Sequence, residues 1–414
     1  MKHIAIIGSG PAGCYLADQL LRVIPDSSID IVEQLPVPFG LIRYGVAPDH
    51  QSTKAVARLF DRTLGRDRVS FFGNVHVGRD VKLDELLELY DAVVLATGAP
   101  KDRKLGIAGE DLAGVIGSGA FVGWYNGYPQ RPEPPVSNVR SAVVIGNGNV
   151  ASDVARILAK GPEELAGSDL PRQVRAWLSA QPLETIHLVG RRGAADAKFT
   201  DHEIEELGTL QRARPIVDPD DLTGDSPLVN TLRTFAHAPH RDTPVTIHFH
   251  FNLTPAEFLG DASLRAVRFR SSDGKTVEIP AQLAITCIGY EAVACCSASP
   301  VNGCFAHEEA KVGDRLFVVG WAKRGPSGTI PTNRAEAQQV AQKIVQEIQD
   351  ANRPGGTGLR ELLERRGVGP IDYAGWRRID DAELAAACAE HCREKLLNTD
   401  EMLETARAGH PKPV

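Results

Sequence analysis

The feature that most constrains this chain is a glycine-rich turn, GSGPAG, which lies between an apolar run and a helical pattern close to the N-terminus. Residues 3–7 have the composition of a buried parallel strand, and residues 14–21 have the periodicity of a helix. Gly8, Gly10 and Gly13 let the pyrophosphate of a dinucleotide approach the backbone, while the helix N-terminus supplies partial positive charge. The arrangement predicts a dinucleotide-binding unit of strand, turn and helix.

An acidic residue follows the next predicted strand. Residues 29–32 form this strand, and Glu33 comes directly after it. A carboxylate in that position can accept hydrogen bonds from the hydroxyl groups of a ribose. A glycine pattern alone is often an ordinary turn, but the strand, the helix and the acid together favour a site for the adenosine end of FAD or NAD.

Length and composition limit the remaining choices. The 414 residues have room for two or three domains, and 43% hydrophobic with 24% charged residues argue against disorder. The net charge of −7 gives no indication of nucleic-acid binding, and no apolar run approaches the roughly 20 residues that span a bilayer. Seven irregularly spaced cysteines disfavour a disulfide framework, and a strand from residue 3 leaves no room for a signal peptide. We therefore expect a monomer in a reducing compartment, either the cytoplasm or the interior of an organelle.

A second glycine-rich turn, GNGNVA at residues 146–151, follows the apolar strand 141–145. The next clear strand leads into Arg191 and Arg192, where the first unit has an acid. Guanidinium groups pair with a 2′-phosphate that an acid would repel, so this site is predicted to prefer NADPH to NADH. Without a preceding glycine turn, two arginines after a strand would indicate a solvated loop. The long gap between turn and arginines also requires an excursion over residues 162–182.

Two further segments have the composition of cofactor contacts. The loop at residues 35–50 is rich in proline, glycine and apolar residues, and it ends in His50. His50 is either a proton carrier at a flavin or a residue that starts a helix, and the sequence leaves both open. After a later apolar strand, a glycine-containing loop leads into a helix expected from about Arg334, with Thr332 or Asn333 as its cap. If that helix start faces a flavin, its dipole would stabilise the anionic reduced ring.

The stretch 200–250 is less informative. Thr200 and Glu203 have the spacing of a helix capping box, which by itself accounts for Glu203. His248 and His250 alternate with apolar residues, so we expect them at exposed positions of a strand and not as metal ligands. The stretch also carries scattered basic residues, which ordinarily form a solvated surface: Arg212, Arg214, Arg233 and Arg241.

Cysteine chemistry is not indicated. Cys388 and Cys392 have the spacing of one helix face, and we expect them in the core because a metal site would need more ligands. No CxxC pair follows the first glycine turn, which disfavours dithiol chemistry. We therefore expect neither a bound metal nor a redox-active disulfide.

Several motifs occur in an order that is typical of one known family. They are the turn at 8–13, PFGLIRYGVAPDH at 38–50, the turn at 146–151, GRRG at 190–193, VGWAKRGPSG at 319–328 and REKLL at 393–397. Through these motifs, which are distributed over nearly the whole chain, the sequence resembles the adrenodoxin reductase family. Its members are ferredoxin–NADP reductases built on two nucleotide-binding domains.

The resemblance implies an α/β fold with two Rossmann-like dinucleotide-binding domains. An NADP-binding domain, residues 102–291, would be inserted into a discontinuous FAD-binding domain, residues 1–101 and 292–414. Besides the glycines of the first turn, the FAD contacts would be Ala12, Glu33, Leu41, Val75, Trp321, Gly328, Thr329 and Ile330. The NADP contacts would be Arg103, Asn147, Gly148, Asn149, Val150, Arg191, Arg192 and Glu203. His50, with Asp153 or Glu206, would form the polar, acid–base surroundings of the flavin.

The implied activity is transfer of a hydride from NADPH to FAD, followed by release of single electrons to a ferredoxin-like iron–sulfur protein. Because the chain is acidic overall, an acidic acceptor would need a local basic surface, formed by the arginines of 200–250 or by Lys323 and Arg324. One alternative is the electron-input subunit of a larger enzyme, similar to the glutamate synthase small subunit. That subunit has an N-terminal cysteine-rich iron–sulfur region, which this sequence lacks. Another alternative is a binding module without turnover, which the intact glycine turns and both arginines disfavour.

Overall fold

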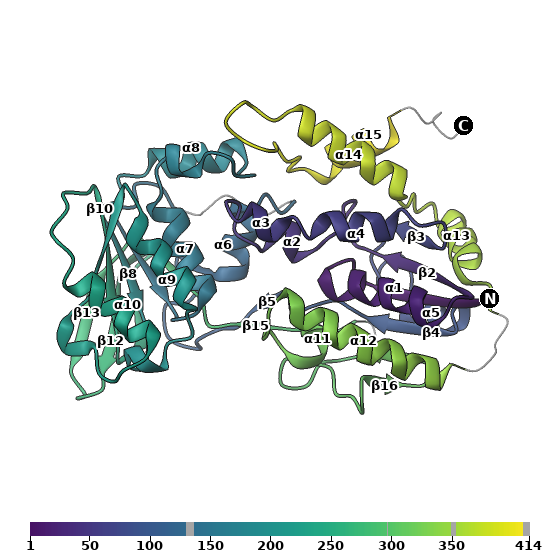
Figure 1. Ribbon diagram of the computed structural model, residues 1–414, viewed down its shortest axis with the longest axis horizontal. Helices are drawn as coiled ribbons and strands as arrows, with labels where there is room; N and C mark the ends of the chain where they lie inside the picture. The colour runs from purple at the N-terminus through teal and green to yellow at the C-terminus, as the bar shows by residue number, and fades with distance from the viewer. Residues whose placement is uncertain (130–135, 296, 349–352, 409–414) are drawn as a thin grey trace.

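The computed structural model describes residues 1–414 except 130–135, 296, 349–352 and 409–414. Its two six-stranded sheets lie side by side along the long axis of the molecule (Figure 1). We call the part built on the sheet that contains β1 the first unit, and the part built on the sheet that contains β7 the second unit.

The sheet of the first unit is parallel except at one edge, where β16 runs antiparallel to β17. The middle of β1 is fully buried, because a parallel sheet is covered on both faces and its strands are accordingly apolar. In spatial order the strands are β16 (Lys311–Gly313), β17 (Leu316–Val318), β4 (Ala92–Leu95), β1 (Lys2–Ile7), β2 (Ser27–Val32) and β3 (Val69–Phe72).

Helices cover both faces of this sheet. The core on one face is completed by α1 (Pro11–Val23), α4 (Ala57–Leu64), α12 (Ile330–Glu347), α14 (Tyr373–Ala385) and α15 (Thr399–Arg407). The core on the other face is completed by α5 (Leu83–Leu89) and α13 (Gly355–Arg365). Both ends of the sequence therefore contribute to the first unit.

The sheet of the second unit is parallel throughout. Its strands, in spatial order, are β6 (Val115–Gly117), β14 (Leu283–Thr286), β7 (Ser141–Ile145), β8 (Thr185–Val189), β10 (Val245–His250) and β9 (Ala213–Ile216). One face packs against α6 (Ser118–Tyr125), α7 (Asn149–Ala159), α8 (Arg172–Ala180), α9 (Asp201–Thr209) and α10 (Pro227–Ala236). The other face packs against an antiparallel sheet of β11 (Leu253–Gly260), β12 (Leu264–Ser271) and β13 (Thr276–Pro280).

The chain passes between the two units through a short antiparallel ribbon of β5 (Lys101–Asp102) and β15 (Tyr290–Glu291), which lies between the units in Figure 1. Short helices occupy the connecting loops: α2 (Leu41–Tyr44), α3 (Gln51–Lys54), α11 (Trp321–Arg324) and the 3-10 turns η1 (Glu163–Leu165), η2 (Ala194–Asp196) and η3 (Pro219–Asp221). The predicted α/β fold, with one Rossmann-like unit inserted into another, is confirmed. The excursion expected over 162–182 contains η1 and α8.

Two sequence-based boundaries are wrong. The helix expected from about residue 334 begins at Ile330 with Thr329 as its N-cap, because Pro331 fits the first turn, where a helix needs no amide donor. The helix expected to carry Cys388 and Cys392 ends at Ala385, and both cysteines are exposed on the segment that follows. The segment leaves the helix because it bonds to the second unit instead.

Two expectations for residues 200–250 also need correction. Thr200 is the N-cap of α9, but its side chain makes no capping bond and Glu203 does not close a capping box. His248 and His250 are half-buried, because they line up beside His187 on the neighbouring strand. None of the helices in the described part of the chain combines the length and apolarity that crossing a bilayer would require.

Candidate active site

The first glycine turn has the geometry of a close backbone approach. Gly8 has a φ of +107°, and a Cβ there would lie 2.5 Å from the carbonyl oxygen of Ala96, so only glycine fits. A Cβ on Gly13 would lie 2.2 Å from the carbonyl oxygen of Gly8. By contrast, a Cβ on Gly10 would meet nothing within 4 Å. Gly10 is also the N-cap of α1, which none of the described side chains caps, so the helix start is open to a phosphate group.

Glu33 lies beside this turn, as its position after β2 predicts. Its Oε2 accepts hydrogen bonds from the amide of Ser9 at 3.0 Å and from the Ser9 hydroxyl at 2.6 Å. The amide of Leu35 donates to Oε1 at 3.2 Å. The carboxylate therefore braces the turn, a structural role that the sequence did not indicate.

Two other segments close around the first turn. The amide of Phe39 donates to the carbonyl oxygen of Ser9 at 3.1 Å, and a Cβ on Gly40 would lie 3.0 Å from the Cα of Gly10. On the other side, a Cβ on Gly320 would lie 2.5 Å from the Cβ of Ala12. These close approaches, which side chains would block, form the cradle that a long flat cofactor needs.

The loop after Gly320 leads to the N-terminus of α12. Trp321 Nε1 and Arg324 Nε both donate to the carbonyl oxygen of Ser327, at 3.1 and 3.0 Å, which fixes the loop before Gly328. The hydroxyl oxygen of Thr332 accepts from the amide of Thr329 at 3.0 Å.

Among the other predicted FAD contacts, Leu41 is 44% exposed whereas Val75 is buried. The hydroxyl of Thr97, next to the first turn, is buried without a partner in the described structure. The residues present therefore fit a bound FAD.

The second glycine turn repeats the geometry of the first. Gly146 has a φ of +139°, and a Cβ there would lie 2.3 Å from the carbonyl oxygen of Cys287. Gly148 faces open space and is the N-cap of α7, which again has no side-chain cap from the described residues. The side chain of Asn147 lies against Gly190, and its Oδ1 is buried without a partner in the described structure. An unpaired acceptor at an open helix start fits a ligand that donates a hydrogen bond.

The predicted NADP contacts are only partly gathered at this turn. The amide of Thr200 donates to Oδ1 of Asn149 at 2.8 Å, which ties the start of α9 to the turn. Arg191 and Arg192 are exposed directly after β8 and are open to a phosphate. Arg103 instead lies on the ribbon between the units, where its Nε donates to the carbonyl oxygen of Tyr290 at 3.2 Å.

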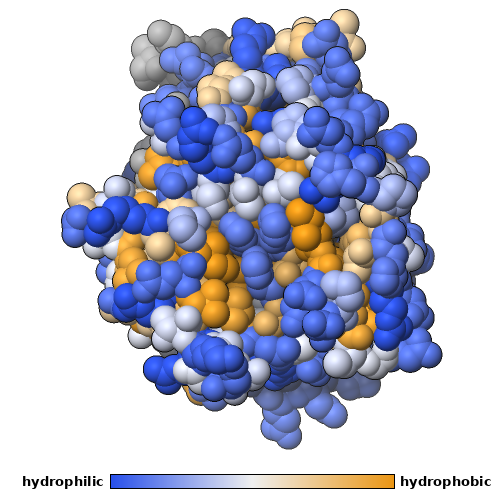
Figure 2. All heavy atoms as spheres, turned by 90° about the vertical axis from the view of Figure 1, so that its left-hand side faces the viewer, coloured by the Kyte–Doolittle hydropathy of each residue, from blue (hydrophilic) through white to orange (hydrophobic). Residues whose placement is uncertain are grey.

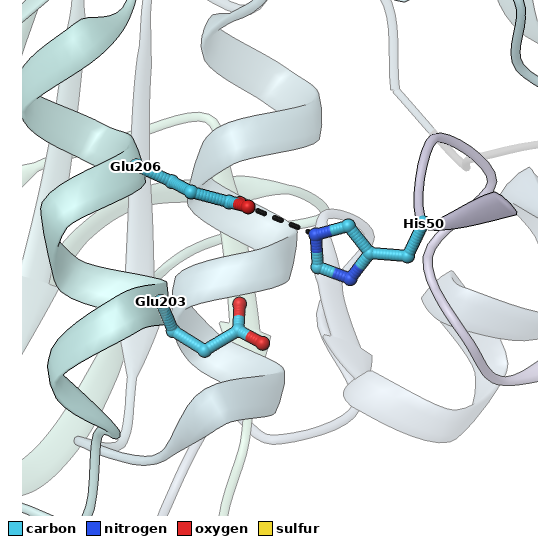
Figure 3. Close-up of side chains that lie close together, drawn as sticks. All are labelled: His50, Glu203 and Glu206. Atoms are coloured by element: carbon cyan, nitrogen blue, oxygen red, sulfur yellow. Dashed lines mark hydrogen bonds and ion pairs between the residues drawn. The ribbon is translucent and has the colours of Figure 1, made fainter. Parts of the chain in front are cut away.

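His50 lies at the junction between the units. Its Nε2 is 3.2 Å from Oε2 of Glu206, and its Nδ1 is 3.9 Å from Oδ1 of Asp153. Figure 3 shows the ring extending from one segment towards Glu203 and Glu206, which are one turn apart on α9. The family resemblance implied Asp153 or Glu206 as the partner of His50, and both acids lie beside it.

A buried arginine organises these acids. Arg156, with a side chain 1% exposed, pairs with Asp153 at 2.6 Å, with Glu206 at 3.1 Å and with Asp49. Lys160 Nζ lies 2.7 Å from Oδ2 of Asp49. Sequence reasoning missed Arg156 and Asp49. The only signals were that Asp153 and Arg156 have the i, i+3 spacing of a helical ion pair and that Asp49 directly precedes His50.

Burial and charge shift the acid strengths in this cluster. Burial, together with the charge of Asp153, raises the pKa of Glu203 to about 7, against the effects of His50 and Arg156. Burial also raises the pKa of Asp153 despite the nearby Arg156. Although burial acts to raise it, Arg156 and Lys160 hold the pKa of Asp49 below its ordinary value. Because burial raises the pKa of Glu203 to about 7 and its Oε2 has no partner in the described structure, this carboxyl can take up or release a proton near neutral pH.

Comparison with known proteins agrees with this geometry. The family model of pyridine nucleotide-disulphide oxidoreductases matches residues 2–301. The mitochondrial NADPH:adrenodoxin oxidoreductase of Homo sapiens is 36% identical, over 97% of this chain and 91% of that protein. This chain belongs to the adrenodoxin reductase family of pyridine nucleotide-disulphide oxidoreductases.

Other members of the adrenodoxin reductase family are similar along their whole length. The NADPH-ferredoxin reductase FprA of Mycobacterium leprae is 36% identical, over 99% of both chains. The solved structure of Mycobacterium tuberculosis FprA in complex with NADPH superposes with a TM-score of 0.94 at 34% identity, over 98% of this chain and 99% of that one. The family predicted from the motifs is confirmed, while the role of each residue towards FAD or NADP stays a prediction.

Proposed function

We propose that this chain is an FAD-dependent ferredoxin–NADP reductase, which oxidises NADPH and reduces a ferredoxin-like iron–sulfur protein. When bound, FAD would accept the electron pair of a hydride and release single electrons, which the nicotinamide does not do. The names of two relatives, NADPH:adrenodoxin oxidoreductase and NADPH-ferredoxin reductase, support this choice of donor and acceptor.

The observation that carries the proposal is that two glycine-turn sites converge on one charged junction. Each turn lies at the carboxyl end of a parallel sheet, where such folds bind dinucleotides. His50 follows the loop that packs on the first turn, and Glu206 lies on the helix that is tied to the second. Cofactors bound at the two turns would therefore meet near His50, as direct transfer between them requires.

We assign residues 1–101 and 292–414 to the FAD-binding domain and residues 102–291 to the NADP-binding domain. This division is supported by the sheets, because the strands of the first sheet fall in the former and those of the second sheet in the latter. The β5–β15 ribbon lies at the proposed boundary. In this proposal FAD contacts Gly8, Gly10, Ala12, Gly13, Glu33, Leu41, Val75, Trp321, Gly328, Thr329 and Ile330. NADP contacts Arg103, Asn147, Gly148, Asn149, Val150, Arg191, Arg192 and Glu203.

The acid–base residues hold and move protons in this scheme. Glu206 orients the His50 ring through a hydrogen bond at Nε2, Asp153 lies near its Nδ1, and Arg156 compensates the negative charge of both acids. Glu203, whose pKa lies near neutrality, supplies a proton-exchanging group beside them. His50, Asp153 and Glu206 are therefore the proposed catalytic residues.

We also propose that the chain works as a monomer in the cytoplasm with a small acidic acceptor. Free thiols occur at Cys14, Cys287, Cys304, Cys388 and Cys392, which suits a reducing compartment. Lys323 and Arg324 are poor docking candidates, because both pair with the buried carboxylate of Glu336. The second unit offers a better surface, where Arg214 and Arg241 line a cavity of about 530 Å³. Figure 2 shows that hydrophilic side chains cover most of that end of the molecule.

The acceptor proposal is tested by NADPH-driven cytochrome c reduction with and without added ferredoxin. We expect the reaction to need ferredoxin and to slow at high salt, because the Debye length falls from about 10 Å at 0.1 M to 3 Å at 1 M. Reversing Arg214 and Arg241, which line the cavity, to glutamate should raise the KM for ferredoxin but spare ferricyanide reduction, which needs no docking site. Arg265→Glu, an exposed reversal on β12, is the matched control. A ferredoxin reaction indifferent to salt and to the double reversal would contradict docking at this surface.

A further inference from the structure

The C-terminal segment links the two units. Between α14 and α15 it runs without helix from residue 386 to residue 398, and we call this stretch the strap. In Figure 1 it reaches from the first unit towards α8 of the second. The amide of Gly167 donates to the carbonyl oxygen of Glu390 at 2.7 Å, and the amide of Cys392 donates to that of Ser168 at 3.2 Å.

The strap is equally well attached to the first unit. Glu383, whose side chain is 0% exposed, pairs with Arg43 of α2 and with Arg393 of the strap at 2.9 Å. The amide of Leu396 donates to Oε1 of Glu383 at 3.0 Å. The strap therefore bridges the units through specific bonds at both ends, and it does not lie loosely over their surface.

Three buried charges meet where the strap crosses the junction. Asp169, in the second unit, receives Lys395 of the strap at 2.9 Å and Lys54 of the first unit at 2.8 Å. The side chains of Asp169, Lys54 and Lys395 are 8%, 8% and 0% exposed. Asn126, the C-cap of α6, completes the group: its carbonyl oxygen accepts from Lys395 at 2.9 Å and its Oδ1 accepts from Lys54 at 3.0 Å. We call Lys54, Asn126, Asp169 and Lys395 the clasp.

The energetics of the clasp indicate that it fixes the position of one unit against the other more than it raises the free energy of unfolding. Two ammonium groups share one carboxylate, and burial, together with Lys54 and Arg43, lowers the pKa of Lys395 to about 7 despite Asp169. Buried ion pairs of this kind often stabilise a fold no more than apolar packing of the same volume would. Apolar surfaces can slide past one another, whereas charges from three separate segments are satisfied in one arrangement only.

The clasp lies directly beside His50. The amide of Asp169 donates to the carbonyl oxygen of Pro48 at 3.1 Å, and the amide of Lys54 donates to the carbonyl oxygen of His50 itself at 3.1 Å. The clasp thus ties the second unit to the chain on both sides of His50. A shift between the units would separate His50 from Glu206, which lies on the other side of the junction.

We propose that Lys54, Asp169 and Lys395 are positioning residues, which hold the second unit against the first and thereby keep His50 in contact with Glu206. The catalytic consequence rests on the proposed function: the rate at which bound NADPH reduces the flavin depends on the clasp, although Lys54, Asp169 and Lys395 are not among the proposed FAD or NADP contacts. The structural consequence, a closed junction, does not depend on that function.

The structural part is tested by hydrogen exchange on the NADP-free holoenzyme. Asp169→Asn leaves two buried cations without a counter-charge. We therefore expect peptides covering 165–171 and 390–396, whose amides bond across the junction, to exchange at least about 10-fold faster. Lys395→Met retains the pair of Lys54 and Asp169, so mainly the strap peptide, residues 390–396, should exchange faster. The matched control is Asp18→Asn, because Asp18 is also a buried acid with two basic partners, Arg22 at 2.9 Å and Arg66 at 3.1 Å, but lies within the first unit.

The catalytic part is tested on the same variants by the rate of flavin reduction and the Kd for NADP. We expect Asp169→Asn to slow reduction at least about 10-fold while the Kd stays within about 2-fold of wild type, and Asp18→Asn to change neither. Unchanged exchange in both clasp variants, or equal slowing by Asp169→Asn and Asp18→Asn, would overturn the proposal. If wild type itself is not reduced by NADPH, the proposed function fails, but the exchange experiment still decides whether the clasp closes the junction.

Discussion

Nε2 of His50 lies 3.2 Å from Oε2 of Glu206, although 156 positions separate the two residues in the chain. The contact joins the loop on the first glycine turn to the helix on the second. It also places an imidazole within a set of acids that Arg156 neutralises only in part. Several expectations follow from this junction and from the two turns that flank it.

Glu203 should make the stability of the protein depend on pH. Its native pKa of about 7 lies above the usual value of about 4.3, so between these values the native state binds more protons than the unfolded state. Stability contributed by the protonated acid is therefore lost as pH rises through this window. The Tm of Glu203→Gln relative to wild type should rise between about pH 5 and about pH 8.

The measurement is thermal unfolding of the NADP-free holoenzyme across that pH range. Glu205→Gln, an exposed change on the same helix, is the control and should show no such trend. A Tm difference between Glu203→Gln and wild type that stays constant with pH would show that the carboxyl is ionised throughout.

Gly8 and Gly10 should respond differently to the same substitution. Gly8→Ala forces a positive φ and a contact at 2.5 Å with Ala96, so it should destabilise the FAD-free protein by about 1–3 kcal/mol. The methyl group of Gly10→Ala points into open space, so the free energy of unfolding of the FAD-free protein should stay within about 0.5 kcal/mol of wild type. FAD binding should nevertheless weaken, because the methyl group occupies the space through which the phosphate approaches. Urea unfolding and FAD titration separate the two effects. Equal loss of stability in both variants would be inconsistent with this geometry.

Arg191 and Arg192 should set the choice between NADPH and NADH. A hydrogen bond to a charged group contributes about 1.5–3 kcal/mol. Replacing either arginine by alanine should therefore weaken NADPH binding by roughly 10-fold to 150-fold. NADH binding should hardly change, because NADH lacks the 2′-phosphate. Fluorescence titration with both nucleotides checks this, and an equal loss for the two would refute the assignment.

The parts of the site that the sequence predicted depend on short segments. The turns at Gly8 and Gly146 could be recognised because strand, glycines and helix are consecutive. Both glycines have positive φ values, which glycine adopts more readily than other residues. Arg191 and Arg192 could be recognised because they directly follow a strand. The sequence alone does not decide the role of His50, since that role depends on Glu206, which comes close only when the chain folds.

The parts that the sequence did not predict depend on distant partners. Two ion pairs join segments more than 100 residues apart, namely Arg156 with Asp49 and Lys395 with Asp169. No local sequence pattern predicts such a pair. The same reason explains the error at Cys388 and Cys392. Their spacing is typical of a helix, but hydrogen bonds to Gly167 and Ser168 hold this segment in a non-helical path at the junction.

Anaerobic titration of the purified protein shows whether NADPH reduces a flavin held at the first turn. We expect a yellow protein whose visible flavin absorbance is lost on addition of one equivalent of NADPH and returns on addition of two equivalents of oxidised ferredoxin. NADH at the same concentration should bleach it far more slowly. A protein that takes up no FAD, or an FAD-loaded protein that NADPH does not bleach, would not be an NADPH-dependent flavoprotein.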